Sequence, residues 1–216
     1  MKTKKHKLLI KGSCLVAAFC IWTALVLTVD VQPVGVNGTA VGFATLNSRI
    51  HSMTGVNMKL YMLTDCLSII PVLVCVVHGF MGAIQAIKHK SIFRVEKDII
   101  YLGFYYVAVI ACYLLFEIFP VNYRPVLISG IMEASYPSST TLLVLSVMQV
   151  LSFQCKKWLA DRKIIKAVEI FSTYFSAGMV LGRFLSGVHW VTDIIGAVLL
   201  SSGLFSIYKG VALTER

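Results

Sequence analysis

The chain has 216 residues, of which 57% are hydrophobic and only 14% are charged. A soluble domain carries about 25% charged residues, so this chain has too few to cover a water-exposed surface. The composition therefore indicates an integral membrane protein and excludes soluble enzymes, nucleic-acid-binding proteins and disordered chains. The formal net charge of +10 marks either an acidic partner or the cytoplasmic side of a bilayer, and the distribution of the basic residues decides between the two.

Six stretches are long and apolar enough to be membrane-spanning helices, each of which needs about 20 predominantly apolar residues. The first follows a basic segment like the start of a signal peptide, but no small-residue cleavage site comes after it, so we interpret it as a retained anchor helix. The sequence therefore predicts an all-α, polytopic membrane protein, with a bundle of six transmembrane helices in a single membrane-embedded domain over residues 1–216. The stretches cover residues 8–29, 60–85, 98–119, 138–155, 166–182 and 190–208.

The basic residues gather on one side of this predicted bundle. With the N-terminus inside, all but four of the 20 basic residues fall in the inner segments, and the exceptions are Arg49, Lys59, Arg124 and Arg183. Cytoplasmic connections carry such an excess of lysine and arginine. The charge distribution thus predicts that both termini are cytoplasmic and that the protein is a multi-pass protein of the cell membrane, such as a bacterial plasma membrane. It also predicts no nucleic-acid partner.

Three polar segments lie at the opposite, outer side of the predicted bundle. They cover residues 122–125 after the third helix, 136–141 at the start of the fourth and 182–193 before the sixth. Both the fourth and the sixth helix begin at this face, where their unpaired backbone amides and dipoles favour an anion. The long outer connection over residues 30–58 either folds over this region or is mobile.

The last of these segments has the residues of a phosphate site. Ser186 is a plausible N-cap, which places His189 in the first turn of the sixth helix and Asp193 on the same face. A carboxylate there can accept a hydrogen bond from one imidazole nitrogen and leave the other free as a nucleophile or base. Arg183 and Arg124 add two guanidinium groups suited to phosphate oxygens.

These residues resemble the motifs of the type-2 phosphatidic acid phosphatase superfamily, the six-helix lipid phosphate phosphatases related to vanadium haloperoxidases. The family pattern is Lys-x6-Arg-Pro, then Pro-Ser-Gly-His, then Ser-Arg-x5-His-x3-Asp. The resemblance covers residues 98–208 in detail and the first two helices by topology alone. The matching positions are Arg124-Pro125, Pro137-Ser138 and Arg183-x5-His189-x3-Asp193.

The resemblance implies a role for each matched residue. His189 would be the nucleophile that forms a phosphohistidine, and Asp193 would orient it. No metal or other cofactor is implied for this chemistry. The residues that would hold the phosphate oxygens are Arg124, Arg183, Ser138 and Ser139.

Two departures from the family pattern affect the expected chemistry. Glu117 stands where the family has a lysine, and Ser139-Thr140 replaces the Gly-His pair of the second motif. The family histidine protonates the leaving alkoxide, which Thr140 cannot do at ordinary pH. General acid catalysis contributes about 10²–10⁴-fold in typical enzymes, so the change predicts a slow enzyme, a replacement acid, or a diphosphate substrate with a better leaving group.

Two residues are candidates for the replacement acid. Glu117 could donate a proton if burial raises its pKa, or it could instead form a structural ion pair with Arg124. His51, in the outer connection, could also reach the site. In the second predicted helix, Asp65 should face the bundle or a polar pocket, and His78 should form an interhelical hydrogen bond.

The function that best fits these residues and the predicted topology is that of a hydrolase acting on lipid phosphomonoesters or diphosphates at the extracytoplasmic face. A polyprenyl diphosphate or a diacylglycerol-type phosphate would suit such a site. The first alternative is an impaired family member that binds lipid phosphate or a partner protein without turnover, and a small-molecule transporter is a third interpretation. The six cysteines show no metal-ligand spacing and are expected to be buried free thiols.

Overall fold

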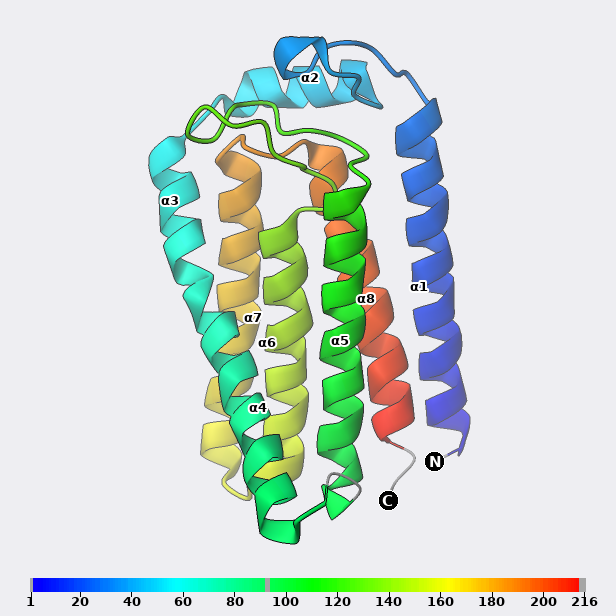
Figure 1. Ribbon diagram of the computed structural model, residues 1–216, viewed down its shortest axis with the longest axis vertical. Helices are drawn as coiled ribbons and strands as arrows, with labels where there is room; N and C mark the ends of the chain where they lie inside the picture. Colours follow the sequence, from blue (N-terminus) through cyan, green and yellow to red (C-terminus); the bar gives the residue numbers. More distant parts are fainter. Residues whose placement is uncertain (1, 92–93, 214–216) are drawn as a thin grey trace.

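The computed structural model describes residues 2–91 and 94–213. This part of the chain folds into eight α-helices and a short 3-10 helix (Val36–Gly38), joined by short connections and by two longer loops over residues 29–43 and 119–138 (Figure 1). The all-α class predicted from the sequence is therefore confirmed. The helices are α1 (Lys2–Thr28), α2 (Ala44–Thr54), α3 (Met58–Leu67), α4 (Ile69–His89), α5 (Lys97–Ile118), α6 (Ser139–Trp158), α7 (Arg162–Leu185) and α8 (Val191–Ala212).

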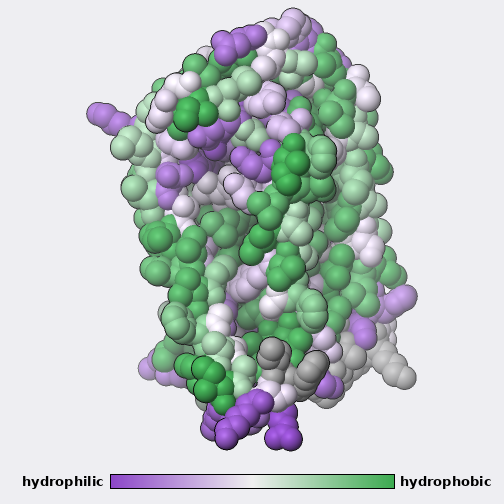
Figure 2. Space-filling model, in the orientation of Figure 1, coloured by the Kyte–Doolittle hydropathy of each residue, from purple (hydrophilic) through white to green (hydrophobic). Residues whose placement is uncertain are grey.

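Seven of these helices run along the long axis of the bundle, and α2 lies across one end (Figure 1). Hydrophilic residues gather at the two ends of the molecule, with a broad hydrophobic band between them (Figure 2). The band includes large side chains that are mostly exposed, such as Phe104 at 70% and Ile118 at 68%. Apolar side chains exposed on this scale identify a lipid-facing surface.

Five helical segments in the described residues are long and apolar enough to cross a membrane, which matches five of the six predicted stretches. A sixth, predicted over residues 138–155, corresponds to α6. The five are Thr3–Thr28, Met58–His89, Lys97–Ile118, Arg162–Leu185 and Val191–Ala212.

Helix α6 is less apolar because it lies at the centre of the bundle. It packs against α4, α5, α7 and α8, and its buried residues include Thr141, Ser146 and Gln154. Its 20 residues give a length of about 30 Å, close to the thickness of the hydrocarbon core. Its neighbours shield these three polar side chains from lipid, so this helix can match the others in length without matching their hydropathy.

The second predicted helix is divided into α3 and α4. Proline at position 71 has no amide hydrogen to donate to the carbonyl of Leu67, so the helical hydrogen-bond pattern is interrupted there. The start of α3 is fixed by Asn57, whose side chain accepts a hydrogen bond from the Leu60 amide at 3.0 Å. Within α4, the imidazole Nδ1 of His78 lies 2.8 Å from the Tyr106 hydroxyl on α5, so the predicted interhelical hydrogen bond is confirmed.

Helix α1 packs closely along α8. A Cβ atom on Gly12 would lie 2.9 Å from the carbonyl oxygen of Gly203 and 2.8 Å from the backbone nitrogen of Ile207. Small residues allow two helix backbones to approach in this way inside a membrane. Near the other end of the pair, the indole of Trp22 donates to the carbonyl of Thr192 at 3.1 Å. These contacts attach the first helix to the one that begins beside the polar end of the bundle.

The six cysteines are free thiols, as predicted. Their predicted burial is wrong, because Cys14, Cys20 and Cys66 are exposed and the other three are half-buried. In a helix that faces lipid, a small apolar side chain is favourable on the outside as well as in the core, so composition alone does not distinguish the two positions.

Candidate active site

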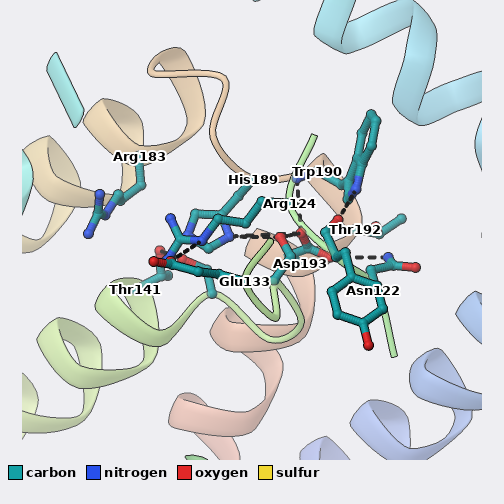
Figure 3. A network of polar contacts seen from close by, with 12 residues as sticks. Asn122, Arg124, Glu133, Thr141, Arg183, His189, Trp190, Thr192 and Asp193 are labelled. Atoms are coloured by element: carbon teal, nitrogen blue, oxygen red, sulfur yellow. Dashed lines mark hydrogen bonds and ion pairs between the residues drawn. The ribbon is translucent and has the colours of Figure 1, made fainter. Parts of the chain in front are cut away.

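The three polar segments predicted at one face come together at the end of the bundle that α2 covers. Asn122 donates from its amide to Asp193 Oδ1 at 3.2 Å, and the indole of Trp190 donates to the carbonyl of Tyr123 at 2.8 Å. The backbone amide of Ser138 donates to the carbonyl of Asp193 at 3.2 Å. Figure 3 shows the resulting polar network, in which His189 lies between Arg183 and Asp193.

The loop between α7 and α8 places His189 ahead of the last helix and not in its first turn. Ser186 was predicted as the N-cap of that helix, but it follows the last residue of α7 and donates to the carbonyl of Arg183 at 2.7 Å. Gly187 then reverses the chain with φ +65°, and a Cβ there would lie 1.8 Å from the carbonyl oxygen of Gly55. The N-cap of α8 is Trp190, whose amide donates to a carboxylate oxygen of Asp193 at 2.9 Å.

A serine connects His189 to Asp193. The His189 Nδ1 atom lies 3.9 Å from Asp193 Oδ2, too far for the direct hydrogen bond that the sequence predicted. The hydroxyl of Ser135 lies between them, donating to Asp193 Oδ2 at 2.5 Å and lying 3.1 Å from His189 Nδ1. Because its single proton is directed to the carboxylate, the hydroxyl accepts from an Nδ1–H group. This assigns the proton to Nδ1 and leaves the lone pair on Nε2.

The imidazole of His189 is neutral. Its exposed fraction is only 4%, and burial lowers its pKa to about 4, with further lowering by Arg124 and Arg183 that Asp193 offsets in part. The buried Nε2 atom has no hydrogen-bond partner in the described part of the chain. A neutral imidazole with a free Nε2 lone pair is the form that acts as a nucleophile.

Arg183 is held in place by three contacts. Its Nη2 atom donates to Asp65 Oδ1 at 2.9 Å and to the hydroxyl of Thr140. Its guanidinium carbon lies 4.7 Å from the centre of the Tyr61 ring, within the range of a cation–π interaction. The Nε and Nη1 atoms are buried without a partner in the described residues. Asp65 thus makes a polar contact with a buried arginine, but its own side chain is 57% exposed, so the predicted position facing the bundle or a polar pocket is not confirmed. Three N–H groups of the guanidinium, one on Nε and two on Nη1, are left for a ligand.

Arg124 is the second guanidinium of the site. Its Nε atom lies 3.1 Å from Glu133 Oε2, and its Nε–H and Nη1–H groups make no aligned hydrogen bond in the described residues. The ion pair predicted between Arg124 and Glu117 is therefore replaced by one with Glu133, because the loop after α5 places Glu133 beside the guanidinium. Arg124 also lies 5.8 Å from the centre of the Tyr61 ring, so one aromatic ring contacts both arginines.

A cavity of about 210 Å³ adjoins Arg124. Glu117, at the end of α5, and Ser139, the first residue of α6, both line it. This places the candidate replacement acid and one of the predicted phosphate-binding serines beside the guanidinium. Glu117 is nevertheless exposed, so the burial on which its predicted role as an acid depended is not present. The other lining residues are Tyr113, Phe116, Glu133, Ala134, Ser135, Tyr136 and Pro137.

The remaining predicted residues lie around this centre. Ser138 precedes α6, as predicted, and its hydroxyl donates to Thr141 Oγ1 at 3.0 Å. His51 on α2 contacts the carbonyl of Gly187 at 3.1 Å, and its ring lies 5.4 Å from that of Trp190. The outer connection therefore folds over the site, and His51 supports the loop that carries His189.

Sequence reasoning did not identify Ser135, Glu133 or Tyr61 as members of the site. Ser135 and Glu133 belong to the loop between α5 and α6, and Tyr61 belongs to α3, far from the motifs. Only the proximity of Ser135 to Pro137-Ser138 hinted at a role, and no spacing pattern singled it out.

No family model and no curated protein matches the chain. Its structure is similar to the crystal structure of the first transmembrane PAP2 type phosphatidylglycerolphosphate phosphatase from Bacillus subtilis, with a TM-score of 0.68 and 19% sequence identity. The similarity covers 95% of this chain and 98% of that one. The protein therefore has the fold of a membrane PAP2-type phosphatase over nearly its whole length, including the first two predicted helices.

Proposed function

We propose that this protein is a lipid phosphate phosphatase that forms a phosphohistidine at His189. The observation that carries the proposal is a neutral imidazole, with its Nε2 atom unpartnered, close to two buried arginines that retain N–H groups without an aligned hydrogen bond in the described residues. Buried polar groups are normally hydrogen-bonded, so this cluster is best explained by an anion that the three side chains share. The membrane fold makes a lipid the natural carrier of that anion.

The proposed reaction begins when the phosphate oxygens accept hydrogen bonds from Arg124 and Arg183. The Nε2 lone pair of His189 attacks phosphorus, and the bond to the leaving oxygen breaks with its electron pair on that oxygen. Arginine N–H groups stabilise the charge on the transferring phosphoryl group. The imidazole becomes positively charged, and the hydrogen-bonded path through Ser135 to Asp193 stabilises that charge. Water then attacks phosphorus, the bond from phosphorus to Nε2 breaks with its electron pair returning to the imidazole, and the proton that the water loses passes to solvent.

The fate of the leaving oxygen selects the substrate class. Thr140 stands where the family has its acid, but an alcohol hydroxyl does not give up its proton at ordinary pH, and this one accepts a hydrogen bond from Arg183. Glu117 lines the cavity beside Arg124 and is the proposed proton donor for an alkoxide. A diphosphate requires this proton less, because a phosphate leaves more readily. The proposed substrates are therefore polyprenyl diphosphates and diacylglycerol-type phosphates, hydrolysed at the outer face by one membrane-embedded domain over residues 1–216.

Binding of a lipid phosphate without turnover is the alternative. It is favoured by Arg183, whose Nη2 atom is already occupied by Asp65 and Thr140, and by the two changes in the motifs. In this case the cluster would bind the phosphate without the proton donor that hydrolysis of an alkyl ester needs.

The decisive experiment offers phosphatidic acid and a polyprenyl diphosphate to the purified chain in detergent. We expect phosphate release that the His189→Ala variant loses, while His89→Ala, an exposed histidine at the end of α4, retains it. Release equal in the wild type and the His189→Ala variant would exclude the enzyme. Lipid phosphate binding without any release would establish the alternative.

The role of Glu117 is tested by Glu117→Gln. We expect this variant to lose activity on phosphatidic acid more than on the diphosphate, because an alkoxide leaving group needs a donated proton more than a phosphate does. Unchanged activity on both substrates would remove Glu117 from the mechanism without affecting the role of His189.

A further inference from the structure

A groove of about 740 Å³ runs along α6, α7 and α8 and shares no residue with the candidate active site. Helices α7 and α8 both pack along α6 and make few contacts with each other, so α6 forms the floor of the groove between them. We refer to it as the α7–α8 groove. Apolar side chains, among them Met148, Phe153, Ala177, Leu181, Val198 and Phe205, line it together with the small or uncharged polar side chains of Gln149, Ser152, Ser172, Thr173, Ser176 and Ser202.

One end of the α7–α8 groove carries positive charge. Lys156, Glu169 and Lys209 line it there. Lys156 forms an ion pair with Glu169, whereas Lys209 has no carboxylate partner in residues 2–91 and 94–213. The Lys209 Nζ atom lies 5.6 Å from the centre of the Phe153 ring, and Lys4, Lys11 and Lys156 lie close enough to repel its charge. An anion at this end would relieve that repulsion.

The length of the α7–α8 groove fits one leaflet of a bilayer. From Glu169 to Leu181 along α7 the rise is about 18 Å, and half of the hydrocarbon core is about 15 Å. Ser172 lines the groove about one turn from Glu169, on the side of the membrane centre, and its hydroxyl is buried without a partner in the described residues. A buried hydroxyl normally donates to an acceptor, and the ester carbonyl of a phospholipid lies at this depth below its phosphate.

We propose that the α7–α8 groove binds an anionic glycerophospholipid of the leaflet at the lysine-rich end of the bundle. Lys209, with Lys156, contacts the phosphate, Ser172 donates to an ester carbonyl, and the acyl chain follows the apolar floor toward Leu181. The occupant is a resident lipid and not the substrate of the phosphatase reaction. The proposal does not depend on the proposed function, because the groove is separate from His189 and its test measures binding.

The test titrates phosphatidylglycerol into the purified full chain in a non-ionic detergent and measures bound lipid by native mass spectrometry. Phosphatidylcholine with the same chains and chain-free glycerol phosphate are the comparison ligands. We expect phosphatidylglycerol to bind more tightly than either. Lys209→Gln should weaken it about fivefold, the contribution of one lysine near an anionic headgroup. Lys163→Gln, an exposed lysine at the same end outside the groove, should leave it unchanged.

A second pair of variants tests whether the acyl chain of the lipid lies in the α7–α8 groove. Ala177 is exposed and lines the groove, so Ala177→Phe should fill it and weaken phosphatidylglycerol binding without disturbing the core. Ile170→Phe, equally exposed on α7 but outside the groove, is the matched control. Equal binding of the two lipids, equal effects of Lys209→Gln and Lys163→Gln, or unchanged binding to Ala177→Phe would each overturn the proposal.

Discussion

At the scale of single residues, the Ser135 hydroxyl is the group through which Asp193 acts on His189. It is buried, and it contacts both side chains at hydrogen-bond distance while they lie 3.9 Å apart. A direct pair would fix the imidazole with one hydrogen bond, whereas this arrangement depends on a loop residue from another part of the chain. Ser135 is therefore a positioning residue for the proposed nucleophile.

Replacing Ser135 by alanine should lower kcat and leave KM nearly unchanged. The variant removes the acceptor of the Nδ1 proton, and we expect a loss of about 10–100-fold, the range found when metal-binding histidines lose such a hydrogen-bond partner. Ser135→Thr keeps the hydroxyl and should retain most of the activity. Steady-state kinetics on the diphosphate substrate measures both constants. A threonine variant as defective as the alanine variant would argue for a packing role instead.

The depressed pKa of His189 makes stability depend on pH in a defined window. The folded pKa of about 4 lies below the ordinary value of about 6.5, so between these values the unfolded chain binds more protons and stability falls as the pH decreases. The loss is complete near pH 4 and amounts to about 3 kcal/mol, at about 1.4 kcal/mol for each pH unit.

His189→Gln, which lacks this titration, is the reference for that measurement. Relative to the variant, the wild type should lose stability between pH 6.5 and pH 4, as followed by thermal unfolding in detergent. Parallel pH profiles of the two proteins would show that His189 is not buried as a neutral group.

At the scale of elements, the central position of α6 explains how a helix with many polar residues belongs to a membrane bundle. Gln154 is fully buried, and its amide donates to the Tyr208 hydroxyl on α8 at 2.5 Å. The hydroxyl of Tyr105 on α5 donates to the backbone carbonyl of Ser146 at 3.1 Å. Such contacts join α6 to its neighbours and leave its first turn beside Arg183, where Thr140 contacts the guanidinium.

The contact between α1 and α8 depends on glycine, which gives a prediction at this scale. Gly12→Leu would place side-chain atoms against the backbone of α8, at positions where even a Cβ lies within 3 Å of other atoms. Overpacking of this kind costs about 1–3 kcal/mol, so the melting temperature should fall by several degrees. Gly103→Leu is the control, because a Cβ on Gly103 meets no atom within 4 Å. Similar losses in both variants would mean that helix propensity, and not the close approach, is responsible.

At the scale of the whole molecule, much of the architecture follows from the sequence, because a helix that crosses the lipid must be long and predominantly apolar. Long apolar stretches locate five segments to within a few residues, and the Arg183–His189–Asp193 spacing locates the centre of the site. The spacing could not predict that Ser135 joins two of these residues. Ser135 and His189 are 54 positions apart, and only the path of the loop after α5 brings them together.

Two other differences between the sequence predictions and the structure also arise because local sequence does not determine which atoms meet in the fold. Glu133 and not Glu117 pairs with Arg124, since the partner of a charge is decided by the fold of a loop that hydropathy does not describe. The start of α8 depends on the carboxylate of Asp193 accepting from the Trp190 amide, and in sequence Ser186 is an equally suitable cap. Local patterns therefore predict which residues gather at the site more reliably than which atoms meet.

The last prediction concerns the orientation of the bundle in the membrane, which determines the leaflet that adjoins the candidate active site and the leaflet that adjoins the α7–α8 groove. Helices α1 and α8 begin and end, respectively, at the end of the bundle opposite α2 (Figure 1). The excess of lysine and arginine predicts that this lysine-rich end lies in the cytoplasm, and we therefore expect α2 and the candidate active site to face outward. In a background without the six native cysteines, Met53→Cys on α2 should react with a membrane-impermeant thiol reagent in intact cells. Ala160→Cys, between α6 and α7, should react only after permeabilisation. The reverse pattern would place His189 at the cytoplasmic face and the α7–α8 groove in the outer leaflet.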